Sequence, residues 1–327
     1  ILGAATALAD SDGYLFTGRL ARRDDPWLND HAVFGTTLFP GTGLLELALS
    51  AARKLGGSTV EELALAAPLV LPQGEGVRLQ LSLEPADASG SRSLSLYSQP
   101  EDAGEDIGWV HHATGVVQTE SVPSPVGFES LAHWPPADGE KIELDAFYDG
   151  LRERGFEYGP TFQGLEEAWL TKTAAYGRVK LPERAVGSAS DYGLHPALLD
   201  AALHTLMAAG QTEEEDTSSV LLPFEWADVA LFAVGASELR VKVELDSQGD
   251  ADSTSARLLI ADGGGQPVAS IGALRVRRAT MQQLAAATKS ETRHLYRVDW
   301  QPALLPKDSW SADGVSVYGG DGILAEQ

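Results

Sequence analysis

A histidine and an aspartate beside apolar helical segments are the residues of this sequence best suited to chemistry. His31 precedes a segment at about 41–55 in which apolar residues recur at helical spacing after Pro40. Asp200 lies inside a second apolar segment, at about 196–209. An imidazole can accept a carbon-bound proton near neutral pH, and a carboxyl group can donate a proton to a leaving hydroxyl. The pair could therefore eliminate water, although a structural role for His31 stays open.

Backbone N–H groups at the start of the first helical segment could stabilise negative charge. Pro40 suits the first helical position, because the N–H that proline lacks would have no partner there. The amides of Gly41, Thr42 and Gly43 could donate hydrogen bonds to a carbonyl oxygen on which charge develops. A base, an acid and such donors are what β-elimination of water next to a thioester requires.

The surroundings of Asp200 favour its protonated form. Apolar neighbours disfavour a charged carboxylate, so we expect Asp200 to hold a proton at neutral pH. His204 follows one helical turn later on the same face, close enough to orient Asp200. The alternative is an ordinary surface pair, against which the adjacent Ala201, Ala202 and Leu203 argue.

Two further segments could contribute to a site, and each also has a plain structural explanation. Tyr158 lies between Gly155 and a Gly-Pro pair, where a sharp turn could present its phenol or merely change the chain direction. The residues at 222–226 could line an apolar wall or pack in the core. Neighbouring His111 and His112 point to opposite faces of an expected strand, so we expect no metal site.

Helix and strand patterns repeat in the two halves of the chain. The expected helices are at 41–55, 144–154 and 196–209. The expected strands are at 14–20, 63–70, 77–83, 94–97, 109–117, 176–182, 220–232, 238–245, 256–262 and 268–278. An apolar helix buries its whole surface when an antiparallel sheet wraps over it, so we predict an α+β fold with two such units.

The predicted organisation has four parts. Residues 1–120 form the unit with His31, and residues 142–280 form the unit with Asp200. Residues 121–141, which are rich in proline, form a linker. Residues 281–327 are expected to be a connector, helical or flexible over 281–293, and the start of a following region with strands at 295–300 and 315–318.

Composition excludes several classes of function. Hydrophobic residues make up 43% of the 327 residues, enough for a sizeable core. A net charge of −23 argues against nucleic acid, whose phosphates would be repelled. No apolar run reaches the roughly 18 residues of a membrane helix. The absence of cysteine suits a cytoplasmic protein, and the chain opens at Ile1 without a leader, as we expect of an excised piece.

Four motifs then occur in a familiar order. They read His31-x-x-x-Gly35-x-x-x-x-Pro40, Gly155-x-x-Tyr158-Gly159-Pro160-x-Phe162, Asp200-x-x-x-His204 and Leu222-Pro223-Phe224-x-Trp226. They resemble the motifs of dehydratase domains in modular polyketide synthases. The resemblance covers about residues 1–280, and residues 295–300 are similar to the start of a ketoreductase region.

The resemblance implies a double hot-dog fold, in which two antiparallel sheets each wrap around one apolar helix. It implies His31 as base and Asp200 as acid, with Tyr158 and His204 assisting at the hydroxyl. The other candidate substrate contacts are Gly35, Pro40, Gly41, Thr42, Gly43, Pro160, Phe162, Leu222, Pro223 and Phe224.

The resemblance further implies a β-hydroxyacyl substrate on the phosphopantetheine arm of an acyl carrier protein, dehydrated during polyketide chain processing without a cofactor. Neighbouring polyketide synthase domains, a ketoreductase among them, are expected partners, and we also consider a homodimer. Since only the start of a ketoreductase-like region is present, no NADPH site is expected.

Other interpretations stay open. The same scaffold could belong to a dehydrating cyclase, to a double-bond isomerase or to a degenerate domain that only binds an acyl chain. Arg275, Arg277 and Arg278 could form a local basic patch for an acidic carrier protein, or simply a solvated strand edge.

Overall fold

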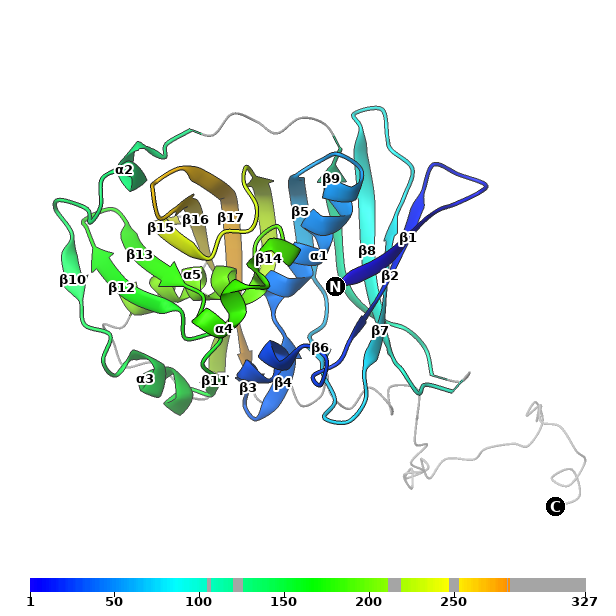
Figure 1. The fold of residues 1–327 in the computed structure, drawn as a ribbon, viewed down its shortest axis with the longest axis horizontal. Helices are drawn as coiled ribbons and strands as arrows, with labels where there is room; N and C mark the ends of the chain where they lie inside the picture. The colour runs from blue at the N-terminus through cyan, green and yellow to red at the C-terminus, as the bar shows by residue number, and fades with distance from the viewer. Residues whose placement is uncertain (105–106, 120–125, 211–218, 247–252, 281, 283–327) are drawn as a thin grey trace, which may run out of the picture. The chain divides into compact units, whose positions relative to one another are not determined.

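Two buried helices form the centre of the computed structural model, which describes residues 1–104, 107–119, 126–210, 219–246, 253–280 and 282. The helices are α1 (Gly41–Lys54) and α5 (Pro196–Ala209), and they pack against each other (Figure 1). Both follow the apolar patterns that predicted them. Pro40 precedes α1 as its N-cap instead of occupying the first helical position.

Antiparallel strands wrap over both helices. The strands of the first half are β1 (Leu2–Ala7), β2 (Tyr14–Leu20), β5 (Thr59–Leu65), β7 (Val77–Leu83), β8 (Ser91–Pro100) and β9 (Val110–Gln118). Those of the second half are β10 (Glu140–Ile142), β12 (Leu165–Leu170), β13 (Ala175–Lys180), β14 (Ser219–Leu231), β15 (Glu238–Asp246), β16 (Ser253–Asp262) and β17 (Pro267–Thr280).

The strands of the two halves form one continuous sheet. Their order is β1-β2-β7-β8-β9-β5-β14-β17-β16-β15-β13-β12-β10. The junction is the antiparallel pairing of β5 with β14, in which Leu63 lies opposite Trp226. The two expected sheets are therefore hydrogen-bonded edge to edge.

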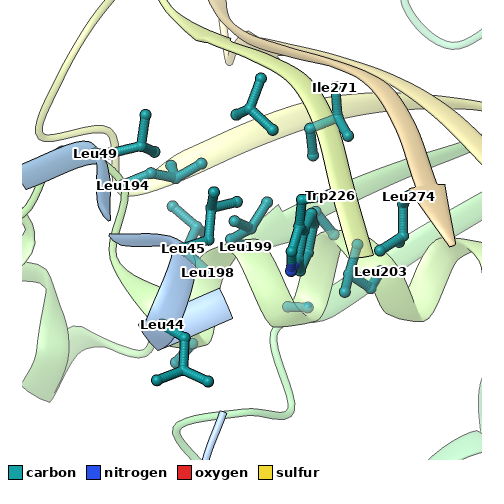
Figure 2. Close-up of a cluster of buried hydrophobic side chains, with 14 of the residues drawn as sticks. Leu44, Leu45, Leu49, Leu194, Leu198, Leu199, Leu203, Trp226, Ile271 and Leu274 are labelled. Atoms are coloured by element: carbon teal, nitrogen blue, oxygen red, sulfur yellow. The ribbon is translucent and has the colours of Figure 1, made fainter. Parts of the chain in front are cut away.

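The core lies between this sheet and the two helices. Figure 2 shows leucines of α1 and α5 packed around Trp226 of β14, with Ile271 and Leu274 of β17 beside them. The side chain of Trp226 is fully buried. The aromatic residue of the fourth motif is therefore a core residue at the junction of the two halves.

A small second sheet holds the first two motifs. Its strands are β11 (Phe156–Tyr158), β3 (His31–Val33), β4 (Thr36–Phe39) and β6 (Leu69–Val70), in that order. Strands β3 and β4 form a tight hairpin whose turn residues, Phe34 and Gly35, have φ of 48° and 74°. The sequence suggested a loop at His31, but a short strand forms there because β11, far away in the chain, pairs with it.

Short helices connect the strands. They are the 3-10 helices η1 (Pro26–Asp30) and η2 (Ala189–Asp191) and the α-helices α2 (Glu129–Ala132), α3 (Phe147–Glu153) and α4 (Glu183–Val186). Helix α2 falls within the expected linker at 121–141, and strand β10 begins inside it, ends one residue beyond it and pairs with β12 of the second half. The domain boundaries stay a prediction. The segments expected at 281–293, 295–300 and 315–318 lie outside the described residues.

A buried carboxylate of α1 holds the start of α5. Glu46 is 3% exposed and accepts backbone hydrogen bonds from Gly193 at 2.8 Å and Leu194 at 3.0 Å. One turn away on α1, the Thr42 hydroxyl donates to the carbonyl of Pro196 at 3.1 Å. Burial raises the pKa of Glu46, and the two amide donors oppose that shift. Two side chains of the first helix thus fix the residues that lead into the second.

We expect Glu46→Gln to destabilise the fold by about 1–3 kcal/mol, because either orientation of the amide points its NH₂ group at one buried backbone N–H. Ser50→Ala is the control, since it removes only the hydroxyl that also donates to Glu46, at 2.9 Å. Denaturant unfolding followed by circular dichroism measures both changes. Equal free energies of unfolding for the two variants would contradict this account.

Candidate active site

His31 is held in a defined tautomer. Its side chain is buried, and Nδ1 lies 2.9 Å from the carbonyl oxygen of Leu38. Because a carbonyl only accepts, Nδ1 carries the hydrogen and Nε2 has the free lone pair. Burial lowers the pKa of His31, and the nearby charge of Asp200 opposes the shift. A neutral imidazole with an unprotonated Nε2 is suited to accept a proton.

Asp200 and His204 lie one turn apart on α5, both buried. Oδ2 of Asp200 is 3.3 Å from Nε2 of His204. That distance suits an ion pair, but the two atoms are not aligned as a hydrogen bond, and neither has another hydrogen-bond partner among the described residues. Catalytic hydrogen bonds are often poorly aligned before substrate binds. The carboxyl group of Asp200 thus lies beside the imidazole of His204 without a hydrogen bond to it.

Tyr158 connects the two halves of the site. Pairing of β11 with β3 sets it opposite His31, with 5.6 Å between the ring centroids. Its ring centroid is also 4.5 Å from that of His204. Burial and the charge of Asp200 raise the pKa of Tyr158, so its phenol stays neutral and can donate. The fold therefore brings together the four residues His31, Tyr158, Asp200 and His204.

Asp30, which sequence reasoning missed, anchors the segment around His31. Its carboxylate accepts from the backbone N–H of Thr161 at 3.0 Å and from Arg184 at 2.6 Å, and its carbonyl accepts from the N–H of Gly159 at 2.8 Å. A Cβ at Gly159 would lie 2.3 Å from Oδ1 of Asp30, so only glycine fits. The second motif thus fastens its own loop to the residue before His31.

The remaining residues of the first two motifs take different positions. The Phe162 ring lies 5.0 Å from that of His31, whereas Pro160 is exposed. Gly35 is exposed in the hairpin turn, where its N–H donates to Glu157 at 2.8 Å. Among these residues, Phe162 is the one in ring contact with the proposed base.

The start of α1 lies against the fourth motif. A Cβ at Gly41 would be 3.6 Å from Cβ of Pro223, so the two residues are in close contact. The N–H of Gly43 already donates to the carbonyl of Pro40 at 2.9 Å, which leaves Gly41 and Thr42 as candidate donors to a substrate carbonyl. Leu222, Pro223 and Phe224 are half-buried. This half-buried segment near the beginning of β14 borders the start of α1.

The three candidate docking arginines differ. Arg275 forms an ion pair with Glu225 on β14. Arg277 is exposed and holds its guanidinium 5.3 Å from the centroid of the Phe224 ring, and Arg278 is exposed as well. Arg277 lies over Phe224, and the neighbouring Pro223 lies against Gly41 at the start of α1.

Other histidines have structural surroundings. His112 donates from Nδ1 to the carbonyl of Ala67 at 3.1 Å and contacts the Ser98 hydroxyl at 2.7 Å. His195 caps α5 by accepting from the N–H of Ala197 at 3.2 Å, and burial lowers the pKa of His195 to about 4. In the part of the chain that the structure describes, no group of three or more His, Cys, Asp or Glu residues is placed to hold a metal ion. No helix there has the length and apolar character needed to cross a membrane.

Comparison with known proteins assigns this architecture. A family model described as "Polyketide synthase dehydratase domain" matches residues 1–99, and one described as "Polyketide synthase dehydratase N-terminal domain" matches residues 127–286. The solved bifunctional dehydratase-cyclase domain of ambruticin biosynthesis is 40% identical, with 88% of this chain and 98% of that domain covered at a TM-score of 0.81. The chain belongs to the polyketide synthase dehydratase domains. The predicted double hot-dog fold is confirmed, and with it the assignment as a hydro-lyase acting on β-hydroxyacyl thioesters.

Two other relatives of this dehydratase domain bear on its setting and its residues. Polyketide synthase GfsA of Streptomyces halstedii is 41% identical over 98% of this chain, which spans only 4% of that protein. The CurK dehydratase is 28% identical, with 86% of this chain and 98% of that domain covered at a TM-score of 0.74. Solved inactive mutants of CurK include one that changes Asp to Asn and one that changes His to Phe.

Proposed function

We propose that His31 is the base and Asp200 the acid of the dehydration. Nε2 of His31 takes the proton from the α-carbon of a β-hydroxyacyl thioester. Asp200 gives its proton to the β-hydroxyl, the C–O bond breaks, and water leaves as the α,β double bond forms. The observation that carries this proposal is the buried, neutral His31 beside a buried carboxyl group of the other half.

The other groups of the site have supporting roles in this scheme. The N–H groups of Gly41 and Thr42 stabilise the thioester oxygen as negative charge develops on it. Tyr158 and His204 hold the leaving hydroxyl or the carboxyl group that protonates it. Every proton in the scheme moves between side chains of this chain and the substrate, so the step we propose requires no cofactor.

We further propose that the acyl group arrives on the phosphopantetheine arm of an acyl carrier protein. The support is the family and the position of exposed Arg277 and Arg278, since they lie near the end of the β14–β17 pairing, opposite Leu222 and Leu221 and near the start of α1. A local basic patch is needed because the chain as a whole carries a net charge of −23. A following ketoreductase region, a homodimer and a cytoplasmic location also stay predictions.

Cyclisation after dehydration is the second candidate function. The observation that favours it is the similarity to the bifunctional dehydratase-cyclase domain. Ring closure needs a distal hydroxyl to approach the new alkene within about 3–3.5 Å. We favour simple dehydration because each group that elimination needs has a candidate residue, whereas no described residue is a candidate for folding the acyl chain back.

We expect His31→Ala and Asp200→Asn each to lower kcat by about 10²–10⁴-fold, the usual contribution of a general acid or base. A 3-hydroxyacyl thioester is incubated with each variant, and the loss of water is followed by mass spectrometry. His112→Asn is the control, because that histidine is hydrogen-bonded to Ala67 and Ser98 and has no role in the proposed scheme. Near-wild-type turnover by a folded His31→Ala or Asp200→Asn variant would remove that residue from the proposed role.

We expect a substrate with both a β-hydroxyl and a distal hydroxyl to be released as the open, unsaturated thioester. Chromatography against synthetic open and cyclic standards identifies the product. The His31→Ala variant controls for spontaneous ring closure. A cyclic ether of one configuration, formed only with active enzyme, would establish the cyclase instead.

We expect Arg277→Glu combined with Arg278→Glu to raise KM for a carrier-bound substrate by about tenfold, because opposite charges speed and orient encounter. Turnover of a short N-acetylcysteamine thioester, which carries no carrier protein, should not change. Lys141→Glu with Lys172→Glu makes the same change in charge at exposed sites on β10 and the β12–β13 turn. Unchanged KM in the arginine variant, or an equal rise in the lysine variant, would exclude this patch as the docking site.

A further inference from the structure

A tyrosine outside the four motifs contacts the histidine that lies beside the acid. Tyr148 is on α3, and its hydroxyl oxygen lies 3.3 Å from Nδ1 of His204. The same oxygen accepts a hydrogen bond from the backbone N–H of Leu165 at 2.9 Å. We propose that Tyr148 is a positioning residue that fixes the tautomer of His204 and, through it, the orientation of Asp200. This inference rests on the acid role proposed for Asp200.

The direction of each hydrogen bond follows from the donors present. The Leu165 N–H can only donate, so the Tyr148 oxygen accepts there and keeps its own hydrogen for another partner. Nδ1 of His204 is the acceptor within reach of that hydrogen. In the arrangement we propose, Nδ1 holds the lone pair, and the hydrogen of a neutral ring is on Nε2. Burial raises the pKa of Tyr148, so its hydroxyl stays protonated and available as the donor.

The fixed tautomer presents an N–H to the acid. Nε2 of His204 is 3.3 Å from Oδ2 of Asp200, so its hydrogen lies beside that side of the carboxyl group, although the two atoms are not aligned as a hydrogen bond in this structure. The opposite tautomer would place the Nε2 lone pair beside a carboxyl oxygen and leave the Tyr148 hydrogen without an acceptor. Tyr148 thus selects the nitrogen of His204 that presents a hydrogen to the proposed acid.

The ring of His204 has little freedom to turn away from this arrangement. Its side chain is 1% exposed and is surrounded by the rings of Tyr158, Tyr148 and Phe147, with centroids at 4.5, 5.6 and 6.1 Å. Packing of this kind holds the plane of the imidazole but does not decide which nitrogen carries the hydrogen. That choice depends on hydrogen bonds alone, and Tyr148 supplies the decisive one.

The first test reads the tautomer directly. The chain has seven histidines, so ¹⁵N-histidine labelling gives a short set of imidazole signals, and the His204→Gln variant identifies the signal of His204 by its loss. We expect the wild-type ring to be protonated on Nε2, and Tyr148→Phe to shift it toward a mixture of tautomers. A ring protonated on Nδ1 in the wild type, or one unaffected by Tyr148→Phe, would overturn the proposal. This readout does not depend on activity, so it stands apart from the roles of His31 and Asp200.

The second test is a double-mutant cycle. We expect Tyr148→Phe to lower kcat about tenfold with little change in KM, and to have less than a threefold effect when His204 is already Gln. Gln at that position can still donate to Asp200, so His204→Gln alone should be mild. Tyr176→Phe removes a hydroxyl from the separate cluster around Trp134 and should leave kcat unchanged. An equal loss in both backgrounds would show that Tyr148 acts by another route, and thermal melting checks that each variant is folded.

Discussion

A buried carboxylate between two helices is the constraint on which the site depends. The proposed acid lies on α5 and the proposed base on β3, close to the start of α1, so the two groups meet only if the two halves hold one fixed relation. Beside the pairing of β5 with β14, Glu46 fixes that relation by accepting hydrogen bonds from the backbone amides of Gly193 and Leu194, just before α5. A charge is costly to bury, and several directed donors offset the cost only in one geometry. Because the buried carboxylate needs both amide donors, this contact holds the start of α5 in one position.

The two histidines of the proposed site are themselves held by neutral hydrogen bonds in a largely apolar setting. His31 is directed by a carbonyl of its own hairpin, and His204 by a hydroxyl from α3. In the proposed arrangement both rings are held in one tautomer before substrate arrives, so little reorganisation would remain for the chemical step. Apolar packing fixes where the rings lie, while single polar contacts fix which nitrogen of each ring can react.

Local patterns predicted the main elements and the four central residues. The helices at α1 and α5 follow from apolar spacing, and strand β7 follows from strict alternation. The contacts missed by sequence reasoning have partners far away in the chain and leave no local pattern. Asp30 binds backbone N–H groups of a later loop. Nothing in the local sequence distinguishes Tyr148 from any other residue of its helix. The strand at His31 was missed for the same reason, since three residues form a strand only beside a distant partner.

The seam between β5 and β14 has a consequence for how this enzyme can move. A hinge between the halves would have to break the backbone ladder of that seam and expose two sheet edges to water, which proteins otherwise avoid. We therefore expect an acyl chain to enter the site without separation of the two halves. Within their shared sheet, the outermost strands are β1 and β10.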